Sequence, residues 1–245
     1  VPVPINAHET SYDIILRVTS PREDPKTHWP LKKQLIKGIF NHHDCRPGGW
    51  DPSHGQDGNT GGVWNDIILH PFKSVFITEC RIQPKLYKDY SECRLLITCK
   101  GVTTLRESVR EAVKVTITSP SGETLSKKHM VTLHPDNPDF SITLDISDPE
   151  LWWSWDLGQP SQYQISIAST AFPTIHRKFG IREVSLDSEK VFRLNGKRLF
   201  LRGTNIIPEQ YLSLLNKDRI EQQVCMMKEA GINIVRIHAH VNRGE

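Results

Sequence analysis

Four polar side chains near the end of the chain have the types and spacing of a ligand-binding edge. Arg202 and Asn205 follow one short apolar run, and His238 and His240 follow a second run that begins at Ile232. The carboxyl ends of parallel strands meet at one edge, and in α/β barrels this edge carries the chemistry. The pattern therefore predicts that these four residues contribute to substrate binding.

A metal-binding interpretation competes at the two histidines. His238 and His240 alternate with Ala239, so both point to one side of a strand, and histidine is a common metal ligand. No third ligand follows at a suitable spacing, so we favour substrate contact and predict neither a metal nor a cofactor. Each of three residues also has a purely structural alternative to substrate binding. Arg202 would pair with a carboxylate, Asn205 would cap a loop, and His240 would be a hydrogen-bonded residue at the barrel rim.

A β-strand, a helix and a second β-strand are needed to position these side chains. Asn195-Gly196 predicts a two-residue hairpin turn, and a strand is expected to start near Leu199. The helix is predicted over 218–230, and a second strand follows Gly231. Strands joined by such a crossover lie parallel, so the sequence predicts one βαβ unit.

Several local signals mark the predicted helix. Asp218 is the predicted N-cap, and Glu221 lies three residues later, as in a capping box. Apolar residues recur at helical spacing and form one stripe: Ile220, Val224 and Met227.

The middle of the chain has the pattern of an antiparallel β-sandwich. Short runs rich in apolar or β-branched residues alternate with turn signals such as Pro120-Ser121-Gly122. The runs cover residues 74–84, 93–100, 113–119, 127–133, 140–146 and 163–168. Six or seven strands at this spacing predict an immunoglobulin-like sandwich. Three tryptophans near its end are expected to pack between domains rather than to stack on a ligand: Trp152, Trp153 and Trp155.

The segment before the sandwich contains a long glycine-rich loop over residues 48–62. Such loops in compact domains are usually functional or disordered, and its aromatic and acidic residues argue against disorder. A nearby cluster also suggests metal ligands, but we favour a packed, hydrogen-bonded loop for it: His42, His43, Asp44 and His54. Glu209 lacks a carboxylate partner and is given no catalytic role.

Composition excludes several other classes of protein. The chain has 245 residues and a net charge of +3 with interspersed charges, which does not indicate nucleic-acid binding. No apolar run approaches the roughly 18 residues of a membrane span. The five cysteines include no CxxC pair, which indicates neither a disulfide framework nor a zinc site. Cys93 and Cys99 share one face of a strand-like run and are predicted to be buried thiols. Residues 1–10 do not form a signal peptide, and no compartment is favoured.

Two motifs resemble glycoside hydrolase family 2, and Arg-Ile-His-Ala-His at 236–240 resembles its β-mannosidase and exo-β-glucosaminidase-like members. The two motifs are Arg-Gly-Thr-Asn-x-x-Pro at 202–208 and Met-Lys-x-Ala-Gly-Ile-Asn-x-Val-Arg at 227–236. Three further stretches are similar to the family's domain junctions: Gly-Val-Trp-Asn at 62–65, the tryptophan-containing segment 148–163 and Phe-Gly-Ile-Arg-Glu-Val at 179–184.

The resemblance implies a mainly β fold in three parts. Residues 1–78 would form the end of a jelly-roll sugar-binding domain, and residues 79–180 the immunoglobulin-like sandwich. Residues 181–245 would lead into a (β/α)8 barrel and form its first βαβ unit.

The resemblance also implies an activity, namely retaining, exo-acting hydrolysis of O-glycosidic bonds in β-mannosides or β-glucosaminides. Both catalytic glutamates are expected beyond Glu245, so this chain would contain neither and would be inactive alone. Asp57 would reach the active site, and His238 would lie against the substrate sugar. The expected partners are a carbohydrate substrate and the remainder of the barrel.

Two other interpretations remain open at this point. A non-catalytic carbohydrate-binding β-sandwich protein would explain the missing carboxylates, but it would not use the start of a barrel. A structural half that associates with a separately encoded barrel would need that partner to cover its exposed strands.

Overall fold

The computed structural model divides the chain into two compact units. Residues 11, 13–17, 63, 67–72, 74–206 and 216–237 are described. The first unit contains His70–Phe200, and the second contains His8–Leu69 together with Leu201–Glu245. Most of the predicted jelly-roll segment therefore lies outside the described residues, and its described residues 13–17 carry no regular secondary structure.

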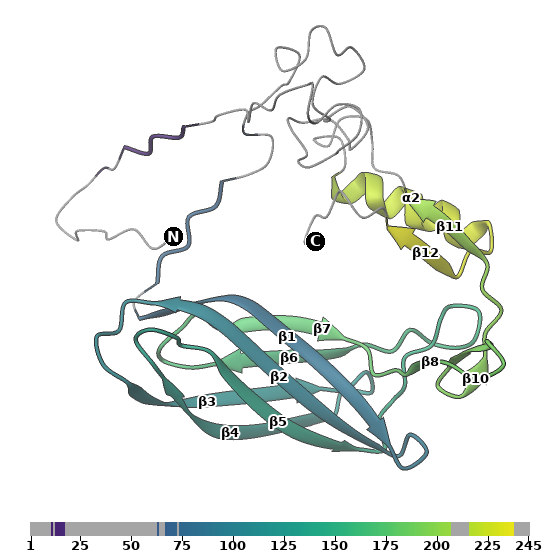
Figure 1. Cartoon of the computed structure of the whole chain (residues 1–245), viewed down its shortest axis with the longest axis horizontal. Coiled ribbons are helices and arrows are strands. Elements are labelled where there is room, and N and C mark those ends of the chain that lie inside the picture. Colours follow the sequence, from purple (N-terminus) through teal and green to yellow (C-terminus); the bar gives the residue numbers. More distant parts are fainter. Residues whose placement is uncertain are drawn as a thin grey trace, which may run out of the picture. The chain divides into compact units, whose positions relative to one another are not determined.

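The first unit is a sandwich of two antiparallel sheets (Figure 1). One sheet has the order β1-β2-β5, formed by Val75–Tyr87, Glu92–Thr103 and Phe140–Ser147. The other has the order β4-β3-β6-β7, formed by Thr124–Leu133, Val109–Thr118, Tyr163–Ala168 and Ile175–Phe179. β2 and β3 each pair with a strand distant in sequence, so the mainly β, immunoglobulin-like prediction is confirmed.

Strict alternation of side chains builds the core of this sandwich. In β2 the buried residues are Cys93, Leu95, Ile97 and Cys99, and the residues between them face outward. The facing strands supply Val113, Val115, Ile165 and Ile167. Because successive side chains of a strand point to opposite faces, both sheets bury one row each against the other.

A small third sheet follows the sandwich within the same unit. It has the order β10-β9-β8, formed by Lys197–Arg198, Phe192–Leu194 and Val184–Leu186. The predicted Asn195-Gly196 turn joins β9 to β10, with φ of 47° and 76° at its two residues. Positive φ at both central positions is the geometry of a type I′ hairpin turn, which confirms the prediction.

The second unit contains the predicted βαβ arrangement. β11 (Gly203–Ile206) and β12 (Ile234–Ile237) pair in parallel, and α2 (Lys217–Glu229) lies between them in sequence. Among the described residues, no helix has the length and apolarity of a membrane span.

The helix ends as predicted but begins differently. Gly231 has φ of 77°, and its N–H and that of Ile232 donate to Lys228 and Met227 carbonyls, which makes a Schellman motif. The predicted N-cap Asp218 is wrong, because Asn216 Oδ1 accepts the Arg219 N–H at 3.0 Å. Asp218 instead lies in the first turn, where its charge complements the helix dipole.

Candidate functional site

The carboxyl edge of the parallel pair β11 and β12 is the candidate functional site. The register pairs Gly203 with Ile234 and Ile206 with Ile237, so both strands end at the same level. Gly203 is required at the other end, since a Cβ there would lie 2.9 Å from the Ile234 Cγ2. A side chain at position 203 would therefore force Ile234 to move at the start of the strand pair.

Asn205 is the described candidate residue nearest this edge. It lies one residue before the end of β11, opposite Arg236 in the register, and it is exposed. An amide at this position offers two donors and one acceptor oxygen, the groups that bind sugar hydroxyls.

Arg202 lies at the opposite end of β11 from the edge at which the sequence placed it. Its Nε donates to the Gly231 carbonyl at 2.7 Å, and its backbone N–H donates to Asn233 Oδ1 at 2.9 Å. The strand begins at Gly203 rather than near Leu199, because the backbone at 199 still belongs to the hairpin, with the Leu199 N–H bonded to the Phe192 carbonyl. Arg202 therefore ties the start of β11 to the carboxyl end of α2, where exposed carbonyls favour a cation.

Three other candidates fall outside the described residues. His238 and His240 follow β12 directly in sequence, and Asp57 belongs to the glycine-rich loop. The histidine and aspartate cluster at 42–54 also lies outside them. Within the part of the chain that is described, no group of three or more His, Cys, Asp or Glu side chains is arranged to hold a metal ion.

The tryptophan segment joins the sandwich to the small third sheet within one unit. Trp152 packs against Gly180, where an added Cβ would lie 2.8 Å from Trp152 Cδ1, and the Arg182 guanidinium lies 4.3 Å from the Trp152 ring. Lys197 Nζ lies 4.6 Å from the Trp153 ring. Trp152 and Trp153 thus each make a cation–π contact with a basic residue of the same unit.

Asn195 does more than form the turn that its sequence pattern predicts, since its side chain also bonds residues distant in sequence. It is buried, its Nδ2 donates to the Trp152 carbonyl at 2.9 Å, and its Oδ1 accepts the Glu183 N–H at 2.8 Å. Tyr90 adds a hydrogen bond from its hydroxyl to Glu183 at 3.2 Å. An Asn before a Gly signals a positive-φ turn, but nothing local indicates these long-range partners.

Among the described residues, the carboxylates with a lowered pKa accept hydrogen bonds from turns and loops, which does not suit a group that donates a proton. Hydrogen bonds from Ser121 lower the pKa of Glu150, and those from the Val191 N–H, with Arg193 beside it, lower the pKa of Asp187. Burial alone would raise the pKa of Glu111, but the hydroxyls of Thr170 and Ser169 outweigh it and lower that pKa. A general acid of a glycosidase needs the opposite, a raised pKa.

Comparisons with curated proteins find similarity to enzymes that act on β-linked sugars. The exo-β-D-glucosaminidase of Streptomyces avermitilis is 27% identical over 154 residues, covering 59% of this chain and 15% of that protein. The β-mannosidase B of Emericella nidulans is 27% identical over 202 residues, covering 77% of this chain and 23% of that protein. The chain thus spans less than a quarter of the length of these two relatives.

Solved structures share the fold at low identity. The exo-chitosanase of Amycolatopsis orientalis matches with a TM-score of 0.55 at 21% identity, over 70% of this chain and 21% of that one. The β-glucuronidase of Parabacteroides merdae matches with a TM-score of 0.55 at 23% identity, over 67% and 21%.

The family model for glycosyl hydrolases family 2 matches residues 75–182, which are the whole sandwich and its exit towards β8. This match coincides with the strands β1 to β7, and the parallel βαβ unit follows it in sequence. Sequence motifs, strand order and relatives agree with this match, and the sandwich of the chain is similar to that of glycosyl hydrolases family 2.

Proposed function

We propose that this chain is part of a retaining, exo-acting β-glycosidase that hydrolyses O-glycosidic bonds. The observation that carries the proposal is the order of parts: a sandwich that matches family 2 is followed, after the small third sheet, by a parallel strand–helix–strand unit. A β-sandwich that only bound carbohydrate would have no use for such a unit, whereas a (β/α)8 catalytic domain begins with one.

The substrate class that we propose is a β-mannoside or a β-glucosaminide. The support comes from the relatives, among which are an exo-β-D-glucosaminidase and several proteins named β-mannosidase B. The domain division at 1–78, 79–180 and 181–245 belongs to the same proposal.

In the proposed mechanism this chain binds and orients substrate. Retaining hydrolysis needs two carboxyl groups about 5–5.5 Å apart, one as acid/base and one as nucleophile. We assign both to glutamates of the remaining barrel. Asn205, His238, His240 and Asp57 would bind the sugar, and Arg202 would act through its hold on α2 and the start of β11.

The stereochemistry of the first product tests this proposal. Protein expressed from the full reading frame is mixed with p-nitrophenyl β-D-mannoside and p-nitrophenyl β-D-glucosaminide, and proton NMR follows the anomer that appears first. Early accumulation of the β-anomer supports retention, and early α-anomer contradicts it.

The non-catalytic alternative gives a different result in the same samples. A carbohydrate-binding protein would bind free mannose or glucosamine in calorimetry and would release no nitrophenol. The sequence of the gene beyond the codon for Glu245 separates the two at lower effort, since the hydrolase requires later strand-like segments that carry two glutamates.

A further inference from the structure

Two cysteines of the sandwich face each other across neighbouring strands. Cys80 of β1 and Cys99 of β2 are direct partners in the antiparallel register. Directly opposite residues have Cα atoms about 4.5–5.5 Å apart, which lies within the range of about 4.4–6.8 Å that a disulfide bridges. The backbone pairing alone therefore brings the two thiols within reach of one another.

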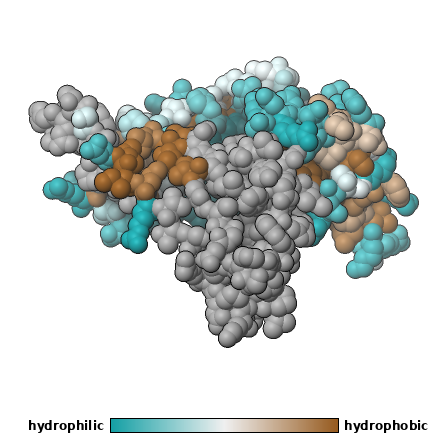
Figure 2. All heavy atoms as spheres, turned by 90° about the horizontal axis from the view of Figure 1, so that it is seen from above, coloured by the Kyte–Doolittle hydropathy of each residue, from teal (hydrophilic) through white to brown (hydrophobic). Residues whose placement is uncertain are grey.

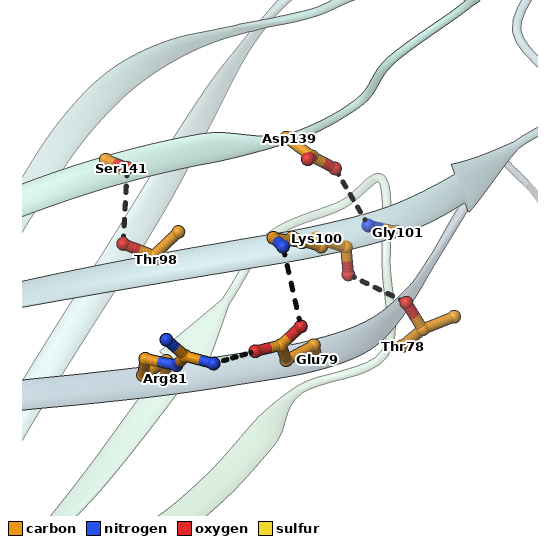
Figure 3. Close-up of polar contacts among 8 residues, drawn as sticks. All are labelled: Thr78, Glu79, Arg81, Thr98, Lys100, Gly101, Asp139 and Ser141. Carbon is orange, nitrogen blue, oxygen red and sulfur yellow. Dashed lines mark hydrogen bonds and ion pairs between the residues drawn. The ribbon is translucent and has the colours of Figure 1, made fainter.

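Both cysteines point to the inner side of their sheet. Figure 3 shows their sequence neighbours on the outer side, where Glu79 lies 3.0 Å from Arg81 and 3.7 Å from Lys100. Since side chains alternate along a strand, Cys80 and Cys99 share the opposite, inner face. There Cys99 is fully buried in the core and Cys80 is half-buried beside it.

The surroundings make the two thiols unequal. A hydrogen bond from Cys99 lowers the pKa of Cys80 to about 7 against the effect of burial, and the charge of Arg177 on β7 acts in the same direction. The bond to Cys80 and burial raise the pKa of Cys99, with a smaller contribution from Asp139 just before β5. A half-buried thiol with a lowered pKa thus lies against a fully buried thiol with a raised pKa, the arrangement of an attacking and a resolving cysteine.

Cys93 provides a contrast within the same strand. It is buried, its register partner is Leu86, and burial raises its pKa to about 11. It lacks both features of the Cys80 site, namely exposure and a second thiol opposite.

We propose that Cys80 and Cys99 form a redox-active pair that a low-molecular-weight disulfide converts into a cross-strand disulfide. The Cys80 thiolate attacks one sulfur of the external disulfide, whose S–S bond breaks, and the first thiolate leaves and takes up a proton. Cys99 then loses its proton and attacks the Cys80 sulfur, which releases the second thiol. The two protein thiols are oxidised, and the external disulfide is reduced to two thiols.

Peptide mapping of the native chain tests the proposal. The protein is incubated with glutathione disulfide at pH 7.5, free thiols are alkylated, and the sample is digested with trypsin. Cys80 and Cys99 fall in the separate peptides 74–81 and 95–100, while Cys93 falls in 89–94. We expect the linked pair 74–81/95–100, which dithiothreitol separates again. The proposal is overturned if Cys80 stays unmodified, or if its mixed disulfide persists without the linked pair.

Two further measurements check the assignment, and the second uses only the unmutated protein, so it does not depend on the folding of a variant. Cys80→Ser should abolish the linked pair, and the matched variant Cys93→Ser should retain it. In the unmutated protein, iodoacetamide should alkylate Cys80 at least about tenfold faster than Cys93 at pH 7, because the thiolate is the nucleophile. Equal rates at the two positions would contradict the assignment of Cys80 as the attacking thiol.

Discussion

The sandwich and the βαβ unit differ in how far their apolar residues are buried. In the sandwich, Leu95 and Ile97 are fully buried within a core to which all seven strands contribute. In the second unit, α2 has no buried residue, and Val224 and Ile237 are 50% and 66% exposed. Exposed apolar side chains contribute to the brown surface visible in Figure 2.

The difference shows that a helix or strand can form from local sequence signals without being buried. Caps, turns and periodicity are local, so α2, β11 and β12 adopt their predicted types. Burial needs a second layer, and the sandwich supplies its own because two sheets face each other. The described part of the second unit has one helix and two strands, whereas a (β/α)8 barrel has eight helices and eight strands.

The largest expected effect comes from a cavity in the sandwich core. Leu95→Ala should lower the free energy of unfolding by about 2–5 kcal/mol, because Leu95 is fully buried. The matched variant Val224→Ala on α2 should cost less than about 1 kcal/mol, since half of that side chain is exposed. Urea unfolding of both variants measures the difference, and equal losses would remove the contrast between the two units.

A second contrast is between two asparagines. Asn195→Ala should cost about 1–3 kcal/mol, because it removes a buried amide and leaves the Glu183 N–H and the Trp152 carbonyl without their partner. Asn205→Ala should change stability by less than about 0.5 kcal/mol, since the residue is exposed. In the full-frame protein Asn205→Ala should instead lower kcat/KM for the aryl glycoside. Loss of stability in Asn205→Ala with unchanged kcat/KM would reverse these assignments.

The start of α2 gives a smaller test. Asn216→Ala should destabilise the helix by about 1 kcal/mol, because the side chain accepts the Arg219 N–H. Asp218→Ala should cost only about 0.3–1 kcal/mol through the helix dipole. Thermal unfolding followed by circular dichroism compares the destabilisation of the two variants. A larger loss for Asp218→Ala than for Asn216→Ala would mean that Asp218 is the N-cap.

The smallest effect concerns acid stability of the sandwich. Folding lowers the pKa of Glu111 from 4.5, so this carboxylate stabilises the fold at pH values above about 4.5. That contribution is lost as the pH falls through the folded-state pKa. Unfolding free energies between pH 6 and 3 should fall less steeply for Glu111→Gln than for the unmutated chain. Parallel pH profiles would mean that the hydrogen bonds from Thr170 and Ser169 do not act through the charge.

Much of this architecture could be predicted from the sequence, since alternation, turn residues and a glycine stop are local signals. The sandwich, the Asn195-Gly196 hairpin and the parallel βαβ order are confirmed. β7 was not among the predicted runs, because His176, Arg177 and Lys178 give it little apolar alternation at a sheet edge.

The placement of Arg202 shows where local signals end. The apolar run Leu199–Leu201 suggested a strand, but hydrogen bonds from residues distant in sequence decide where β11 begins. The partner of the Arg202 side chain is a carbonyl 29 residues away. The binding roles of Asn205 and His240 remain predictions from their positions in the sequence, and those of Asp57 and His238 rest on the family resemblance.

Hydrolysis by the full-frame protein and by this 245-residue chain alone tests the central claim most directly. Both are incubated with p-nitrophenyl β-D-mannoside and p-nitrophenyl β-D-glucosaminide under identical conditions, and nitrophenol release is recorded. We predict turnover of at least one substrate by the full-frame protein and none by the 245-residue chain, which would supply scaffold and substrate contacts without the catalytic carboxylates. Turnover by the 245-residue chain, or none by the full-frame protein on either substrate, would contradict the account.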